Sequence, residues 1–250
     1  MQNANDSINE AIDLLKRNGY AVMKNMGVEA PGYFPYHNNW SIYQPWRNHP
    51  LIDRVASRLA EKAARTLVPR DRLYTVHRLL ANSLPLQGEI WEAGVYQGGS
   101  ALLICEELRH KGIGDTMVRL FDTYEGMPET HPEFDLHKKG AFADTSLETV
   151  VDLVGSDAFI EYRKGMIPET FSGLEDKCVK FAHIDLDIYD SIKDACEFIW
   201  PRLVSGGAVV FDDYGYATCP GARKAIDEYF KPLPVHPLVL PTGQAIIVKP

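Results

Sequence analysis

From residue 88 onward, short apolar runs alternate with segments of helical character, and this alternation constrains the fold more than any other feature. The runs are expected to be strands, because they are brief and bounded by glycine, proline or acidic residues. They cover residues 89–95, 118–123, 158–163, 180–186 and 207–212. The helices are expected to start near Gly98, Ser146, Pro168, Tyr189 and Pro220. Strands separated by helices predict an α/β fold with a doubly wound, mostly parallel sheet.

The C-terminal tail departs from this alternation. After the last expected helix, the segment VHPLVLPTGQAIIVKP holds two strand-like runs around Thr242 and Gly243. These runs predict an antiparallel hairpin at the sheet edge, which brings the sheet to seven strands. A parallel sheet closed in this way is typical of the class I, Rossmann-like core of methyltransferases that use S-adenosylmethionine, and the dinucleotide-binding fold lacks the hairpin.

The N-terminal part has a different character. Residues 6–18 predict an amphipathic helix, and residues 31–50 are rich in aromatic residues, Pro and Asn without a helical or strand period. We therefore expect residues 1–70 to be a helical and aromatic extension that acts as a lid or an interface. Residues 71–250 would then form the catalytic domain. Tyr, Trp and Arg are common in interfaces, so the extension favours a homo-oligomer.

Composition excludes several classes of protein. The net charge is −8 and no run of basic residues occurs, which argues against a nucleic-acid partner. No signal peptide or apolar stretch long enough for a membrane span is evident. The four cysteines are scattered without metal-finger spacing, which is typical of a reducing, cytoplasmic compartment.

A glycine-rich segment, EAGVYQGGS, follows the first expected strand and opens a helix. Gly94, Gly98 and the glycine after it give a GxxxGG pattern rather than the GxGxxG of dinucleotide sites. Glu92, two residues earlier, suits an ammonium group better than a pyrophosphate. Asp122 ends the second strand, where an acid can accept hydrogen bonds from both ribose hydroxyls. These residues predict a cofactor that contains a nucleoside, and the polar residues 125–145 predict a lid over it.

Two further strand ends carry paired acids, in HIDLDIYDS and FDDYG. Four carboxylates at one sheet edge raise each other's pKa unless a cation separates them. A hard divalent ion such as Mg²⁺ fits oxygen ligands of this kind. The four acids are Asp185, Asp187, Asp212 and Asp213. His183, on the strand before them, is typical of a core histidine but could also contact the cofactor.

Four segments together resemble the TylF-type O-methyltransferases, named for macrocin O-methyltransferase. They are GEIWEAGVYQGGSA, RLFDTYEGMPE, KFAHIDLDIYDS and GAVVFDDYG, within about residues 80–230. The resemblance implies S-adenosyl-L-methionine and Mg²⁺ as cofactors and Asp187 as the general base. It places metal ligands at Asp185, Asp212 and Asp213. It places cofactor contacts at Glu92, Gly94, Tyr96, Ser100 and Asp122, with Asp144 and Ser146 near the adenine.

The resemblance implies methyl transfer to a hydroxyl of a sugar or deoxysugar, on a small-molecule glycoside. One alternative is a metal-dependent O-methyltransferase of a catechol or another diol. A second is a protein that binds a nucleoside or sugar without catalysis, although such a protein has no need of a base beside a metal. The glycine spacing argues against an oxidoreductase that uses nicotinamide.

Overall fold

The computed structural model describes residues 2–18 and 44–250, and the chain divides into two compact units, residues 1–35 and 36–250. The first unit contains helix α1 (Gln2–Arg17), which confirms the helix expected near the N-terminus. Most of the aromatic segment 31–50 lies outside the described residues. The expected homo-oligomer stays a prediction.

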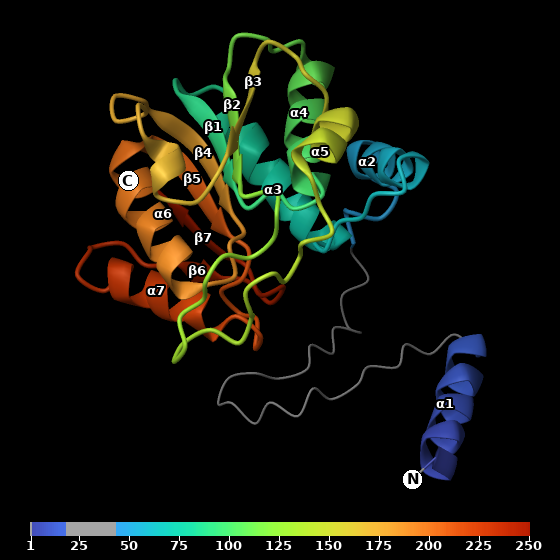
Figure 1. The fold of residues 1–250 in the computed structure, drawn as a ribbon. Coiled ribbons are helices and arrows are strands. Elements are labelled where there is room, and N and C mark those ends of the chain that lie inside the picture. Colours follow the sequence, from blue (N-terminus) through green and yellow to red (C-terminus); the bar gives the residue numbers. More distant parts are fainter. Residues whose placement is uncertain (1, 19–43) are drawn as a thin grey trace. The chain divides into compact units, whose positions relative to one another are not determined.

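The second unit is built on a seven-stranded sheet in the order β3-β2-β1-β4-β5-β7-β6 (Figure 1). Strands β1 to β5 are parallel to one another, and β7 is antiparallel to both β5 and β6. The mostly parallel sheet and its C-terminal hairpin are thereby confirmed. The strands are β1 (Glu89–Ala93), β2 (Val118–Asp122), β3 (Ile160–Lys164), β4 (Val179–Ile184), β5 (Leu203–Phe211), β6 (Leu238–Val239) and β7 (Ala245–Val248).

Helices cover both faces of the sheet (Figure 1). One face carries α3 (Arg70–Ser83), α4 (Gly99–Lys111) and α5 (Leu147–Val154), with α2 (Pro50–Glu61) packed on α4. The other carries α6 (Tyr189–Arg202) and α7 (Pro220–Phe230). Helix α2, which lies before residue 70, packs into the core around α4. The functional division expected at residue 70 stays a prediction. No helix among the described residues is long and apolar enough to cross a membrane.

Alternate residues of each strand fill two separate cores. Ile90 of β1 packs with residues of α2 to α5, whereas Trp91 packs with Phe171 and the residues of α6 and α7. Successive side chains of a strand point to opposite faces, so a central parallel strand must be apolar on both. This explains why the central strands read as nearly continuous apolar runs in the sequence.

One expected helix is not formed. The sequence suggested a helix starting near Pro168, but the structure has only the 3₁₀ turn η1 (Glu169–Phe171) there. Ser172 leaves the helical conformation, and Gly173 follows with a φ of +79° in the left-handed region. The turn still buries Phe171 between β1 and α6, so a short segment supplies the packing that a helix would have supplied.

The site is positioned by the centre of the sheet. From β1 the chain moves outward to β2 and β3, and from β4 it moves to β5 on the other side. The loops after β1 and β4 therefore diverge, and in open α/β sheets ligands bind in the crevice at such a switch point.

Candidate active site

A cavity of about 250 Å³ opens at the carboxyl ends of β1, β2, β4 and β5. Its walls include the glycine-rich segment, the acidic strand ends and part of the loop 125–145. Of the residues predicted from the sequence, it is lined by Gly94, Tyr96, Ser100, Asp122, Asp185, Asp187, Asp212 and Asp213. Five others do not line it, namely Glu92, Gly98, Asp144, Ser146 and His183.

The glycine-rich loop makes its turn at two left-handed residues. Gly94 has a φ of +87°, and a Cβ added there would lie 1.7 Å from the carbonyl oxygen of Asp185. Gly98, also at +87°, is the N-cap of α4 and turns the chain into that helix. Glycine at position 94 therefore allows β1 and β4 to end side by side beneath the cavity.

Asp122 holds this loop in place. One carboxylate oxygen accepts hydrogen bonds from the backbone N–H groups of Val95 and Tyr96, at 2.7 and 2.9 Å. The other accepts from the N–H of Tyr124 at 2.6 Å. The first oxygen already accepts two bonds, so a ribose hydroxyl would bind the second oxygen, whose other contact is the Thr123 hydroxyl at 3.4 Å. The contact itself stays a prediction.

Asp144 and Ser146 have local partners rather than a place in the cavity wall. Asp144 accepts from the Tyr96 hydroxyl at 2.9 Å and pairs with Arg65 at 2.6 Å. The Ser146 hydroxyl caps α5 by accepting from the N–H of Thr149 at 3.2 Å. A serine at this position satisfies a helix end, which explains its presence without a ligand. Contact of either residue with adenine stays a prediction.

Three carboxylates meet at the floor of the cavity. Oxygen atoms of Asp185, Asp187 and Asp213 all lie within 4.8 Å of one another. Burial, followed by the negative charge of Asp213, raises the pKa of both Asp185 and Asp187 well above the usual range. Such a set is suited to a divalent cation, because three oxygen ligands and mutual repulsion are both present before an ion binds.

Asp187 is held in a defined orientation. It has a φ of +60°, a left-handed conformation that a residue other than glycine adopts rarely. Its backbone N–H donates to a carboxylate oxygen of Asp213 at 2.9 Å. Its own carboxylate accepts from the Cys219 thiol at 3.2 Å. A strained backbone fixed by neighbours is common at functional sites.

Asp212 lines the same cavity, and its carboxylate lies within 4.8 Å of ligand atoms of His183 and Asp185, so its role as a metal ligand stays a prediction. Its buried carboxylate forms an ion pair with Arg72 of α3, whose Nε donates to it at 3.1 Å. The side-chain amide of Gln244 donates to the same carboxylate at 2.7 Å. The guanidinium already neutralises Asp212, so it is less available to a cation than Asp185 or Asp213.

Glu92 and His183 lie below the cavity instead of in its wall, because both are fully buried within the sheet. The His183 ring and Glu92 are 2.8 Å apart, and the other ring nitrogen lies 3.5 Å from Asp212. Burial lowers the pKa of His183, but the hydrogen bond and charge of Glu92 outweigh burial and raise it above its usual value. Arg72, Asp212, His183 and Glu92 thus form a continuous chain of polar contacts under the site.

The sequence analysis missed Arg72 and Gln244, and it assigned no role to His137 or Cys219. Arg72 carried a detectable signal. It stands one helical turn before Val76 and two turns before Leu80, on the buried face of α3. A charged residue on an apolar helix face needs a buried partner. Gln244 lies beside the hairpin turn and carried no such signal.

Comparison with known proteins identifies the family. The sequence model of the macrocin O-methyltransferase (TylF) family matches residues 52–236. A tetracenomycin rhamnosyl 4'-O-methyltransferase of Streptomyces olivaceus is 32% identical over 191 residues, which cover 70% of this chain and 71% of that protein. The mycinamicin III 3''-O-methyltransferase of Micromonospora griseorubida is 26% identical, with 66% of this chain and 70% of that protein covered.

Solved structures agree on the fold. The O-methyltransferase NovP aligns with a TM-score of 0.66 at 22% identity, over 74% of this chain and 82% of its own. CalS11, a calicheamicin methyltransferase, aligns with a TM-score of 0.59 at 20% identity, over 83% and 98%. Since the family match spans most of the sheet and its helices, the chain belongs to the macrocin O-methyltransferase (TylF) family and is an O-methyltransferase that depends on S-adenosylmethionine.

Proposed function

We propose that this enzyme transfers the methyl group of S-adenosylmethionine to a hydroxyl of a sugar or deoxysugar on a natural-product glycoside. The observation that carries the proposal is the cluster of Asp185, Asp187 and Asp213 in the same cavity as the glycine-rich loop. Relatives named for rhamnosyl and mycinamicin O-methylation support a sugar acceptor.

The lining residues fit both cofactors. Gly94, Tyr96, Ser100 and Asp122 would hold S-adenosylmethionine on the side of β1 and β2. Asp185 and Asp213 would hold Mg²⁺, with Asp212 as the third ligand implied by resemblance. Asp187 is the third carboxylate by proximity. When bound, S-adenosylmethionine supplies the methyl group, and Mg²⁺ supplies positive charge where the hydroxyl oxygen becomes negative.

In this proposal Asp187 removes the proton of the acceptor hydroxyl. A base must lie within hydrogen-bond reach of that proton, and Asp187 lines the cavity with its orientation fixed by Asp213 and Cys219. Residues of the loop 125–145, among them Met127 and Phe142, line the cavity and would exclude water from it. Positioning of the hydroxyl in line with the methyl group completes the role of the protein.

Two variants test the proposal, and for each we measure kcat, the affinity for S-adenosylhomocysteine and the Mg²⁺ concentration needed for activity. Asp187→Asn should lower kcat by about 100-fold or more, because general-base catalysis contributes factors of this size. Its affinity for S-adenosylhomocysteine, measured by calorimetry in Mg²⁺, should equal that of the wild type. Asp213→Asn should instead raise the Mg²⁺ concentration needed for activity.

Acceptor choice separates the remaining functions. A panel of deoxysugar glycosides and catechols should show turnover with the glycosides. Turnover with catechols alone would favour the diol alternative, and wild-type turnover by Asp187→Asn would remove Asp187 as the base.

A further inference from the structure

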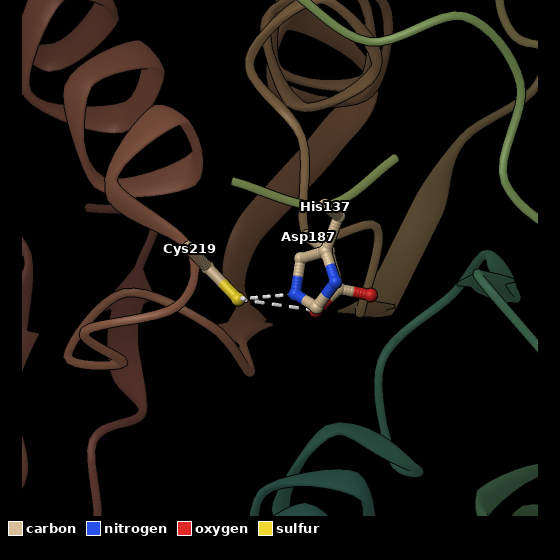
Figure 2. Close-up of side chains that lie close together, drawn as sticks. All are labelled: His137, Asp187 and Cys219. Atoms are coloured by element: carbon tan, nitrogen blue, oxygen red, sulfur yellow. Dashed lines mark hydrogen bonds and ion pairs between the residues drawn. The ribbon is translucent and has the colours of Figure 1, made fainter. Parts of the chain in front are cut away.

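A second group of ligating side chains lies beside the three carboxylates. Figure 2 shows His137, Asp187 and Cys219 converging from three separate segments: the loop 125–145, the turn after β4 and the turn before α7. The Cys219 sulfur lies 3.5 Å from Nε2 of His137 and 3.2 Å from Oδ1 of Asp187. Nε2 of His137 and Oδ1 of Asp187 are 3.7 Å apart. All three residues line the cavity.

These separations are near those of a tetrahedral metal site. With ordinary bonds from zinc to sulfur, nitrogen and oxygen, tetrahedral angles hold the ligand atoms about 3.4 to 3.6 Å apart. The observed separations of 3.2, 3.5 and 3.7 Å lie close to this range. Small rotations of side chains would therefore bring the three atoms around one ion, with a fourth position left for water.

The ligand types differ from those of the neighbouring carboxylate cluster. A thiol, an imidazole and one carboxylate favour zinc, whereas a set made of oxygen atoms favours magnesium. Asp187 belongs to both groups, since its oxygen atoms also lie within 4.8 Å of those of Asp185 and Asp213. The two groups therefore offer adjacent places to ions of different chemistry, with one shared carboxylate.

We propose that His137, Asp187 and Cys219 form a second metal site, specific for a thiophilic divalent ion such as Zn²⁺, and that an ion there inhibits the enzyme. The ion would occupy the carboxylate of Asp187 and join the loop 125–145 to the start of α7. The proposal that an ion binds here rests on the geometry of the three side chains alone. The inhibition rests on the proposed function, because it requires Asp187 to be the base.

Cobalt is the direct probe, because its bond to a thiolate gives a charge-transfer absorption band. Enzyme freed of transition metals and then saturated with Mg²⁺ is titrated with Co²⁺ and then with Zn²⁺. We expect the band to reach its plateau at one equivalent of Co²⁺ and to disappear when Zn²⁺ displaces the cobalt. Cys219→Ser should abolish the band, and Cys178→Ser, which alters an exposed cysteine elsewhere, should retain it.

Affinity and inhibition complete the test. In competition with a chromophoric chelator, Cys219→Ser and His137→Ala should each weaken zinc binding by about 100-fold or more, since even residues outside the ligand set contribute 10- to 100-fold. Cys219→Ala serves as a second variant, and circular dichroism verifies the fold of each. Each variant's rate in Zn²⁺ is divided by its own rate without Zn²⁺, and this ratio should approach one in Cys219→Ser.

Two results would overturn the site: a folded wild type without a thiolate band, or Cys219→Ser that binds zinc as tightly as the wild type. Zinc binding at Cys219 without inhibition would overturn the regulatory part. Failure of the proposed function looks different, because zinc would still bind with the thiolate band while no sugar acceptor is methylated.

Discussion

Gly94 shows how a single residue sets the geometry of the site. Its φ is +87°, and a Cβ there would meet the carbonyl of Asp185 at 1.7 Å. Gly94→Ala should therefore destabilise the protein by at least about 2 kcal/mol, from backbone strain and the forced separation of β1 and β4. Urea unfolding measures the change in the free energy of unfolding.

Gly112→Ala is the matched control for this prediction. Gly112 is also left-handed, at +68°, but nothing lies within 4 Å of an added Cβ. Both variants carry the backbone strain, and only Gly94→Ala carries the collision. Equal losses of stability in the two variants would contradict the close approach of the two strands.

Residue-level prediction from the sequence succeeds where the chemistry is local to a strand end. Asp185, Asp187 and Asp213 could be brought together because parallel strands end at one edge of the sheet. The pairing of Asp212 with Arg72 could not, because their contact joins α3 to β5 and depends on how the helix packs. The ion pair of Asp212 is therefore a tertiary contact that the sequence does not reveal, and the role of Asp212 as a metal ligand stays a prediction.

At the scale of elements, the first turn of α5 allows a test of whether Ser146 caps the helix or contacts the cofactor. Ser146 and Thr149 form a reciprocal capping box at its first turn. Ser146→Ala should cost about 1 kcal/mol of stability, as loss of a cap typically does. Ser146→Asp, which preserves an N-cap, should restore most of it. Thermal unfolding and the affinity for S-adenosylhomocysteine are measured for both variants.

Binding should be nearly unchanged in Ser146→Ala, because the hydroxyl serves the helix and does not line the cavity. A tenfold loss of affinity in both variants would show that Ser146 contacts the cofactor instead. The unfolding temperature of Ser146→Asp is the control, because it shows whether a change in affinity comes from a loss of stability.

Elements were predictable when their length and pattern pointed the same way. The runs of the five parallel strands and the turn at Thr242 and Gly243 carried enough signal to place them. The segment after Pro168 has too few residues before Ser172 and Gly173 to form a helix, and only its burial of Phe171 gives it a place in the fold.

At the scale of the whole sheet, the cavity and a network of ion pairs lie at opposite ends of the strands. The cavity occupies the carboxyl ends of the strands. At the amino ends, Arg119 of β2 pairs with Glu89 of β1 at 2.6 Å and with Glu161 of β3. Trp91 also donates to Glu89, at 2.8 Å. This ion-pair network joins three strands without touching the site, so the charge of Glu89 can be removed with little effect on ligands.

Low pH should weaken this ion-pair network at the amino ends of the strands. Burial raises the pKa of Glu89, but hydrogen bonds from Arg119 and Trp91 outweigh burial, so its pKa lies below the usual value. A lowered pKa in the folded state contributes stability above the unfolded pKa of about 4.3, and that stability is lost as the pH falls through the folded pKa. Glu89→Gln should be less stable than the wild type at neutral pH, and the difference should shrink toward acid.

Urea unfolding at a series of pH values from neutral to acid tests this prediction. Glu61→Gln is the control, since Glu61 is 65% exposed and pairs with Arg58 on the surface of α2, where an ion pair contributes little. A difference between wild type and Glu89→Gln that stays constant with pH would show that the carboxylate of Glu89 does not stabilise the fold through its charge. Unchanged affinity of Glu89→Gln for S-adenosylhomocysteine would support the separation of stability from binding, because the network and the cavity lie at opposite ends of the same strands.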